Sequence, residues 1–134
     1  MKTTAELHTL ALICLATALM WIPYMLARIG TRGLTATLGE PSASGPADPA
    51  WAQRAKAAHL NAVENLAIFA PLVIIAGMAG ISTTGTILAT QLYLWARIAH
   101  YLVYAAGIPV VRTVAFVIGF GAMVFFALTI LAGT

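Results

Sequence analysis

The sequence predicts an all-α integral membrane protein, a bundle of four transmembrane helices forming one domain over residues 1–134. Of its 134 residues, 61% are hydrophobic and 8% are charged, whereas soluble domains carry about 25% charged residues. Three stretches without charged residues, 9–27, 66–96 and 113–134, are long enough to cross a bilayer core of roughly 30 Å. The middle stretch is divided at residues 80–85 by Gly, Ser and Thr, which favour a turn, so it supplies most of two crossings.

The first helix is expected over residues 4–29 and is interpreted as a retained membrane helix. A cleaved signal peptide begins with a basic segment, but here Lys2 is soon followed by the acidic Glu6. The single cysteine, Cys14, lies inside the apolar run, so no disulfide framework is expected. A loop is then expected over residues 30–50, where regular structure is disfavoured by Pro41, Pro46 and Pro49.

The second helix is expected over residues 49–79, with Asp48 as an acidic cap and Pro49 in its first turn. At about 46 Å it exceeds the hydrocarbon core, so its first two turns should project from it. The third helix is expected over residues 83–104. The fourth is expected over residues 109–132 and opens at Pro109.

The basic residues gather on one side of this predicted bundle. With four crossings, the loops after the first and third helices share one side, which carries Arg28, Arg32, Arg54, Lys56 and Arg112; the other side has Lys2. Basic loops favour the cytoplasm, so both termini are expected to face away from it. Distributed in this way, the net charge of +3 indicates membrane topology and not nucleic-acid binding.

Polar side chains form stripes on two of the predicted helices. On the second helix, successive residues turn by about 100°, which aligns Arg54, Asn61, Glu64 and Asn65 and leaves Lys56 and His59 outside the stripe. On the third helix, one face gathers Tyr93, Arg97, His100, Tyr101 and Tyr104. Both stripes are therefore expected to face the inside of the bundle.

Glu64 and Arg97 are the most informative residues, because an ionisable side chain at membrane depth is costly unless it is paired or faces water. A direct ion pair between them would make both tolerable. Two interpretations remain: the stripes only join the helices, or they line a functional polar pocket. The pocket is favoured, because the stripes exceed what one ion pair needs.

Arg112 stands in the first turn of the fourth predicted helix. Alone it would be interpreted as a topology anchor. Together with Arg28, Arg54 and Arg97 it gives several guanidinium groups at one level of the bundle. Guanidinium groups bind carboxylates and phosphates through paired hydrogen bonds, so a small anion from the cytoplasm is the expected ligand.

Two segments resemble the family of membrane-associated proteins in eicosanoid and glutathione metabolism (MAPEG). Residues 54–71, RAKAAHLNAVENLAIFAP, resemble its second-helix signature, and residues 97–112, RIAHYLVYAAGIPVVR, resemble its passage from the third to the fourth helix. The chain is similar to a bacterial-type member related to microsomal glutathione transferases, which implies a multi-pass protein of the bacterial inner membrane. The resemblance also implies a homotrimer that binds glutathione between subunits near the cytoplasmic face, with no metal.

The resemblance further implies roles for individual residues. Asn61 and Glu64 would hold the glutamyl end of glutathione, Arg97 and Tyr104 would line its pocket, and Arg112 would lie near the thiol. His100 aligns with a pocket position, and a purely structural role is the alternative. Eukaryotic members usually carry an arginine where this chain has Ala57, and Arg54, one turn earlier on the same face, is the candidate substitute.

The leading function is a membrane-bound glutathione-dependent transferase or peroxidase that acts on lipophilic electrophiles, with Arg112 stabilising the thiolate. The alternative is a non-catalytic membrane interaction protein of the same fold. It is supported by Ala57 and by Phe116, which replaces a tyrosine common in the family. A small drug exporter is disfavoured, because the acidic residue of its first helix lies deep in the membrane, whereas Glu6 lies near the terminus.

Overall fold

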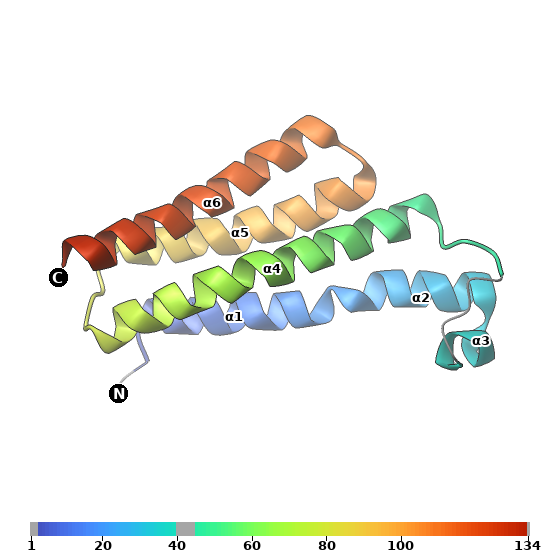
Figure 1. Cartoon of the computed structure of the whole chain (residues 1–134), viewed down its shortest axis with the longest axis horizontal. Coiled ribbons are helices and arrows are strands. Elements are labelled where there is room, and N and C mark those ends of the chain that lie inside the picture. Colours follow the sequence, from blue (N-terminus) through green and yellow to red (C-terminus); the bar gives the residue numbers. More distant parts are fainter. Residues whose placement is uncertain (1–2, 40–44, 134) are drawn as a thin grey trace.

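The computed structural model describes residues 3–39 and 45–133, and within these ranges the chain forms helices and no strands. Lys2, Pro41 and the two ends of the predicted domain lie outside the described residues. Figure 1 shows the elements in order: α1 (Ala5–Leu19), α2 (Trp21–Arg32), α3 (Leu34–Leu38), α4 (Ala50–Met78), α5 (Thr84–Ala106) and α6 (Pro109–Ala132).

The first predicted helix is interrupted, since α1 ends at Leu19 and α2 begins at Trp21. The cause is Pro23, which has no N–H to donate to the carbonyl of Leu19 one turn earlier and whose ring crowds that carbonyl. The carbonyl of Met20, at the break, instead accepts a hydrogen bond of 2.8 Å from the hydroxyl of Tyr101 on α5. The structure therefore corrects a single helix over 4–29 to two segments that reach Arg32.

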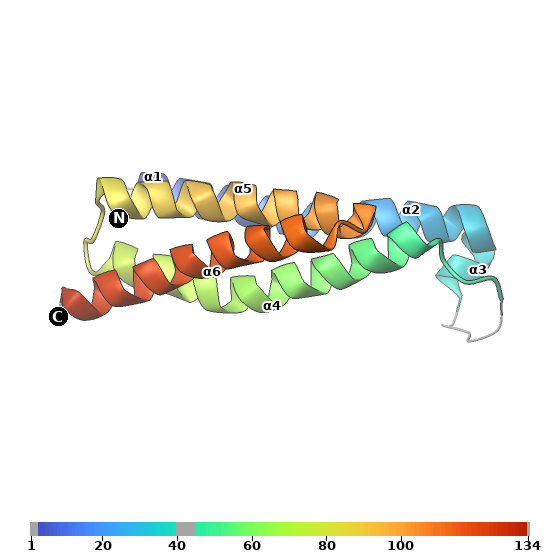
Figure 2. The ribbon, with the colours of Figure 1, turned by 90° about the horizontal axis from the view of Figure 1, so that it is seen from above.

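The expected loop over 30–50 is also partly helical, because α2 continues to Arg32 and the short α3 follows. Gly33 joins them with a φ of +83°, a left-handed conformation that glycine adopts without strain. Figures 1 and 2 show α2 and α3 extending past the ends of the other helices.

The expected cap of α4 is different in the structure. Pro49 is the N-cap residue, and no side chain caps the helix. Asp48 instead pairs with Arg28 at 3.3 Å and with Arg32 at 3.8 Å. Its carboxylate is satisfied by two cations on α2, which explains why it does not turn toward the amides of α4.

The helices α4, α5 and α6 begin and end within two residues of the predicted bounds, because the turns between them contain clear helix breakers. Gly80 and Gly107 adopt positive φ angles of 71° and 79°, which suits a helix end. Thr83 and Thr86 form a reciprocal capping box at the start of α5, and Pro109 opens α6.

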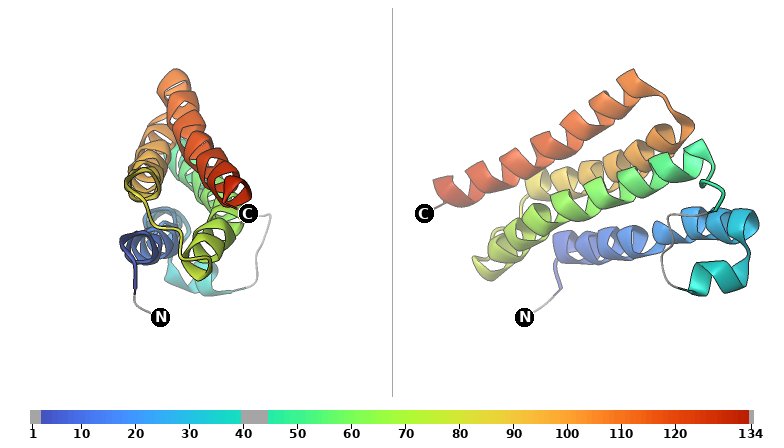
Figure 3. Two further views of the ribbon diagram at one scale, coloured as in Figure 1. Left: turned by 90° about the vertical axis from the view of Figure 1, so that its left-hand side faces the viewer. Right: turned by 45° about the vertical axis from the view of Figure 1, so that its right-hand side comes forward.

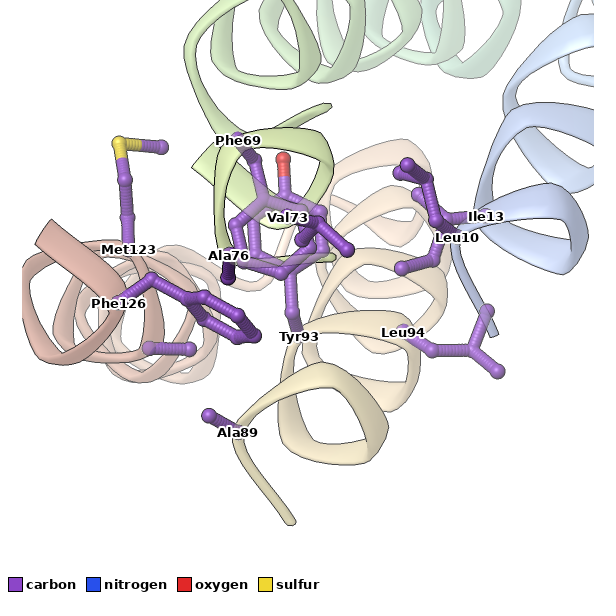
Figure 4. Close-up of a cluster of buried hydrophobic side chains, with 11 residues drawn as sticks. Leu10, Ile13, Phe69, Val73, Ala76, Ala89, Tyr93, Leu94, Met123 and Phe126 are labelled. Carbon is purple, nitrogen blue, oxygen red and sulfur yellow. The ribbon is translucent and has the colours of Figure 1, made fainter. Parts of the chain in front are cut away.

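Consecutive long helices run antiparallel, and the start of α1 and the end of α6 lie at the end of the bundle that holds the α4–α5 turn (Figures 1 and 3). The core is aromatic at its centre. Phe69 stacks on Tyr93 with ring centroids 3.7 Å apart, and Phe126 meets Phe69 edge-on at 5.6 Å. Figure 4 shows these rings together with Val73 and Ile13, so α1, α4, α5 and α6 share one core.

Three helical segments are long and apolar enough to cross a membrane: Ala5–Arg32, Ala50–Met78 and Pro109–Ala132. The fourth long helix, α5, packs against α6, α4 and α1. It carries most of the buried polar side chains of the described chain, including Arg97 and His100, which lowers its mean hydropathy.

The end of the bundle near the termini holds a buried carboxylate. Glu6 is 3% exposed and accepts hydrogen bonds from the hydroxyl of Ser82 at 3.0 Å and from that of Thr86 at 2.6 Å. Nearby, the amide of Gln91 donates to the hydroxyl of Thr9 over 3.0 Å. These bonds join α1 to the start of α5 and to the turn before it.

Candidate functional site

A cavity of roughly 250 Å³ opens between the last two turns of α5 and the first two turns of α6. It is lined by His100, Tyr104, Arg112, Thr113 and Phe116. Gly107 in the left-handed conformation and Pro109 at the first position of α6 turn the chain sharply here. The sequence-predicted residues His100, Tyr104 and Arg112 are thereby brought together at the basic end of the bundle.

Three polar side chains of this cavity have no hydrogen-bond partner among the described residues, whereas the hydroxyl of Thr113 donates to the carbonyl of Pro109 over 3.1 Å. The Arg112 guanidinium lies over the ring of Tyr104, with Cζ 4.5 Å from the ring centroid. His100 meets the same ring edge-on at 5.5 Å and is 4% exposed. Within the described chain, none of these three side chains forms a hydrogen bond or ion pair. Their donors and acceptors are therefore available to a ligand.

Arg97 lies beside the cavity without lining it. Its guanidinium donates a hydrogen bond from Nη1 to Oδ1 of Asn61 over 3.0 Å. Its Cζ is 5.3 Å from the ring centroids of both Tyr93 and Phe116. The side chain is 2% exposed, and its Nε and Nη2 have no hydrogen-bond partner among the described residues. The structure thus holds a buried cation behind Phe116, a wall of the cavity.

Glu64 is not the partner of that cation. It is exposed on α4 and forms no ion pair with a described residue. The expected Glu64–Arg97 pair is therefore absent from the described chain, and Asn61 takes the place of the carboxylate. The prediction that this part of the stripe faces inward was wrong, because Glu64 lies at the edge of the stripe and α4 buries alanines instead, including Ala58 and Ala62.

The four predicted arginines do not converge within one chain. Arg54 donates a hydrogen bond from Nε to the carbonyl of Ala105 over 3.0 Å, which caps the end of α5. Arg28 pairs with Asp48 on the projecting segment. Arg112 alone among them lines the cavity, while Arg97 lies behind it.

Thr113 and Gly119 are neighbours of this site that the sequence alone did not single out. Phe116 follows Thr113 by three residues and Arg112 by four, spacings that place the Phe116 side chain close to both on the surface of α6. Gly119 follows Phe116 by three residues, and its role depends on the position of Arg97, which no periodicity gives. No group of three metal-ligating side chains occurs in the part of the chain that the structure describes.

The model of the MAPEG family matches residues 9–132, which include all six helices apart from the first turn of α1. A comparison with curated proteins gave no match.

Proposed function

Because the chain belongs to the MAPEG family and is an integral membrane protein, we propose that it is a glutathione-dependent transferase or peroxidase for lipophilic electrophiles. The carrying observation is the cavity between α5 and α6, in which Arg112, Tyr104 and His100 keep their polar groups free. The family likeness supports glutathione as the ligand, because its members generally use it.

The residues present fit an anionic tripeptide in part. A guanidinium with free N–H groups suits an anionic group such as a carboxylate, and the aromatic walls of Tyr104 and Phe116 can pack against the methylene groups of the tripeptide. At roughly 250 Å³ the cavity is smaller than a typical ligand pocket of about 300–1,000 Å³. One chain therefore offers part of a site for glutathione.

A neighbouring subunit would supply the remainder. Glu64 is an exposed carboxylate near the middle of α4, a position that is costly in lipid. An interface between copies would cover it and give it a role in holding the glutamyl end of glutathione. This reasoning supports an assembly of several copies, and the family likeness favours a homotrimer.

Arg112 is the proposed catalytic residue. When bound, glutathione supplies a thiol whose ionised form is the nucleophile, and a free thiol has a pKa of about 8.5. The Arg112 guanidinium favours the ionised form by charge, and the Tyr104 ring beneath it holds the guanidinium over the cavity. No side chain of the protein needs to form a covalent bond.

The surroundings of the cavity favour a lipophilic second substrate. Its α6 wall continues into apolar residues such as Val114 and Val117, which are exposed on the membrane-facing surface. We further propose four crossings, with α5 as the third, in a bacterial inner membrane. The cavity then opens at the cytoplasmic end, because that end carries Arg54, Lys56 and Arg112.

The test is conjugation of glutathione to an activated aryl halide by the purified protein in detergent. The proposal expects saturable turnover in both substrates that depends on Arg112. The alternative is a non-catalytic interaction protein, which is supported by Ala57 and Phe116. It predicts neither turnover nor glutathione binding across pH, and that result would overturn the enzymatic proposal.

A further inference from the structure

The buried position of Arg97 depends on contacts from two helices. Asn61 of α4 accepts a hydrogen bond from Nη1. From α6, Phe116 places its ring over the guanidinium, and Gly119 leaves the space in which the rest of the group lies. Because Nε and Nη2 have no hydrogen-bond partner in the described chain, packing and one hydrogen bond fix this cation.

Gly119 is the residue whose backbone the Arg97 guanidinium approaches most tightly among the described glycines. A Cβ atom at this position would lie 2.9 Å from Nη2 and 3.0 Å from Nε of Arg97, so the guanidinium would have to move from its place between Asn61 and Phe116. Two residues later on the same helix, a Cβ atom at Gly121 would meet nothing within 4 Å. The absence of a side chain at 119 is therefore specific to the approach of Arg97.

We propose that Gly119 and Asn61 are positioning residues that hold the Arg97 guanidinium behind Phe116, from where its fixed charge favours the thiolate of a ligand in the cavity without touching it. This inference rests on the proposed function. It assigns Arg97 a role different from lining the pocket, and it gives Gly119 a role in specificity for an ionised thiol.

The distances support an effect through space. The guanidinium is 5.3 Å from the centre of the Phe116 ring, and a ligand atom touching the other face adds about 3.5–4 Å. At roughly 9 Å and an effective dielectric constant of about 20, a unit charge shifts the ionisation of a thiol by about one pH unit. A neutral side chain in place of Arg97 would remove that shift.

Other charges near the cavity must be separated from this effect. Among the described residues, the charged and titratable groups near it are Arg97, His100 and Tyr104 of α5, Arg112 of α6 and Arg54 of α4, with Tyr93 next to Arg97. Among them, His100 lines the cavity, so proton uptake by this side chain must be separated from that of the ligand. A ligand without a thiol proton reports only the pH dependence of the protein, and the difference from glutathione then gives the titration of the glutathione thiol.

The first experiment is a double-mutant cycle on thermal unfolding, with Gly119→Ala in the wild-type and Arg97→Met backgrounds. In wild type, Gly119→Ala should lower the melting temperature by about 5 °C or more, because the guanidinium is displaced. In the Arg97→Met background the same change should be neutral or stabilising, since alanine favours a helix over glycine. Gly121→Ala is the matched control in both backgrounds. Equal effects of Gly119→Ala in both backgrounds would overturn the positioning role.

The second experiment follows the bound thiolate of glutathione by its ultraviolet absorbance as a function of pH, in the wild type and in Gly119→Ala, Arg97→Met and Gly121→Ala. The first two substitutions should move the midpoint up by about one pH unit, and Gly121→Ala should not move it. The affinity of S-methylglutathione, which has no thiol proton, is measured over the same pH range in each of the four proteins, so that the pH dependence contributed by the protein can be subtracted.

The outcomes separate the two proposals. Glutathione binding with an unchanged thiolate midpoint in Gly119→Ala and Arg97→Met would overturn this inference and leave the proposed function standing. A wild-type protein that does not bind glutathione would overturn both. Arg97→Lys, which keeps the charge, should restore most of the midpoint shift lost in Arg97→Met, a result that a merely structural role would not give.

Discussion

The guanidinium of Arg112 lies over the ring of Tyr104, with its Cζ 4.5 Å from the ring centroid. This contact spans the turn between α5 and α6 and brings the basic group to the mouth of the cavity. A cation over an aromatic face is held by the negative charge density of the ring. The guanidinium is thus oriented by the protein while its N–H groups remain free for a ligand.

Replacement of Arg112 by alanine should reduce the kcat for glutathione conjugation by about 10²–10³-fold, the usual effect of removing one charge-stabilising donor. Arg112→Lys should retain part of the activity, because it keeps the charge. The assay is initial-rate kinetics with an activated aryl halide, and Lys56→Ala, an exposed change on α4, is the control. Wild-type turnover in Arg112→Ala would rule out the assigned role.

Replacement of Arg54 by alanine should lower the free energy of unfolding by about 1–2 kcal/mol, because the carbonyl of Ala105 loses its donor at the negative end of α5. Thermal unfolding in detergent measures this, again with Lys56→Ala as control. A normal melting temperature with a large rise in the KM for glutathione would show instead that Arg54 acts mainly on the ligand.

Replacement of Glu64 by glutamine should weaken glutathione binding about tenfold or more, the effect of losing a charged hydrogen-bond partner. The melting temperature of the isolated chain should barely change, because Glu64 is exposed. Calorimetry measures the affinity, and light scattering measures the oligomeric state. Unchanged affinity in a protein whose oligomeric state is also unchanged would contradict a ligand-binding role for Glu64.

Replacement of Glu6 by alanine should destabilise the protein by roughly 2–3 kcal/mol, because the hydroxyls of Ser82 and Thr86 lose their acceptor. The KM for glutathione should stay at its wild-type value, since this cluster lies at the end of the bundle opposite the cavity. His8→Ala, an exposed change on the same helix, serves as control. A KM effect without a loss of stability would show coupling between the two ends.

The positions of α4, α5 and α6 could be predicted because glycine, proline and threonine mark their ends strongly. The break at Met20 could also have been predicted from the sequence, since Pro23 lies inside the predicted first helix. Both are local effects, decided within one turn of the chain. The role of Asp48 could not be predicted from local sequence, because its partner Arg28 lies 20 residues earlier, on α2.

The sequence predicted which residues gather in the candidate site better than it predicted how they are arranged in space. Periodicity placed Arg97, His100 and Tyr104 on one face of α5, and the structure brings His100 and Tyr104 to the cavity with Arg112. Periodicity could not decide which residue of α4 meets Arg97, because the rotation and offset of neighbouring helices depend on packing. Asn61 rather than Glu64 is the partner for this reason.

The most direct test of the account is the thermal stability of the purified protein with and without glutathione, in wild type and in Arg112→Ala. Ligand at about one hundred times its Kd should stabilise the wild type by about 2.7 kcal/mol, with a clear rise in melting temperature and a much smaller one in Arg112→Ala. An equal shift in both proteins would contradict the assignment of Arg112, and no shift in the wild type would contradict glutathione binding itself.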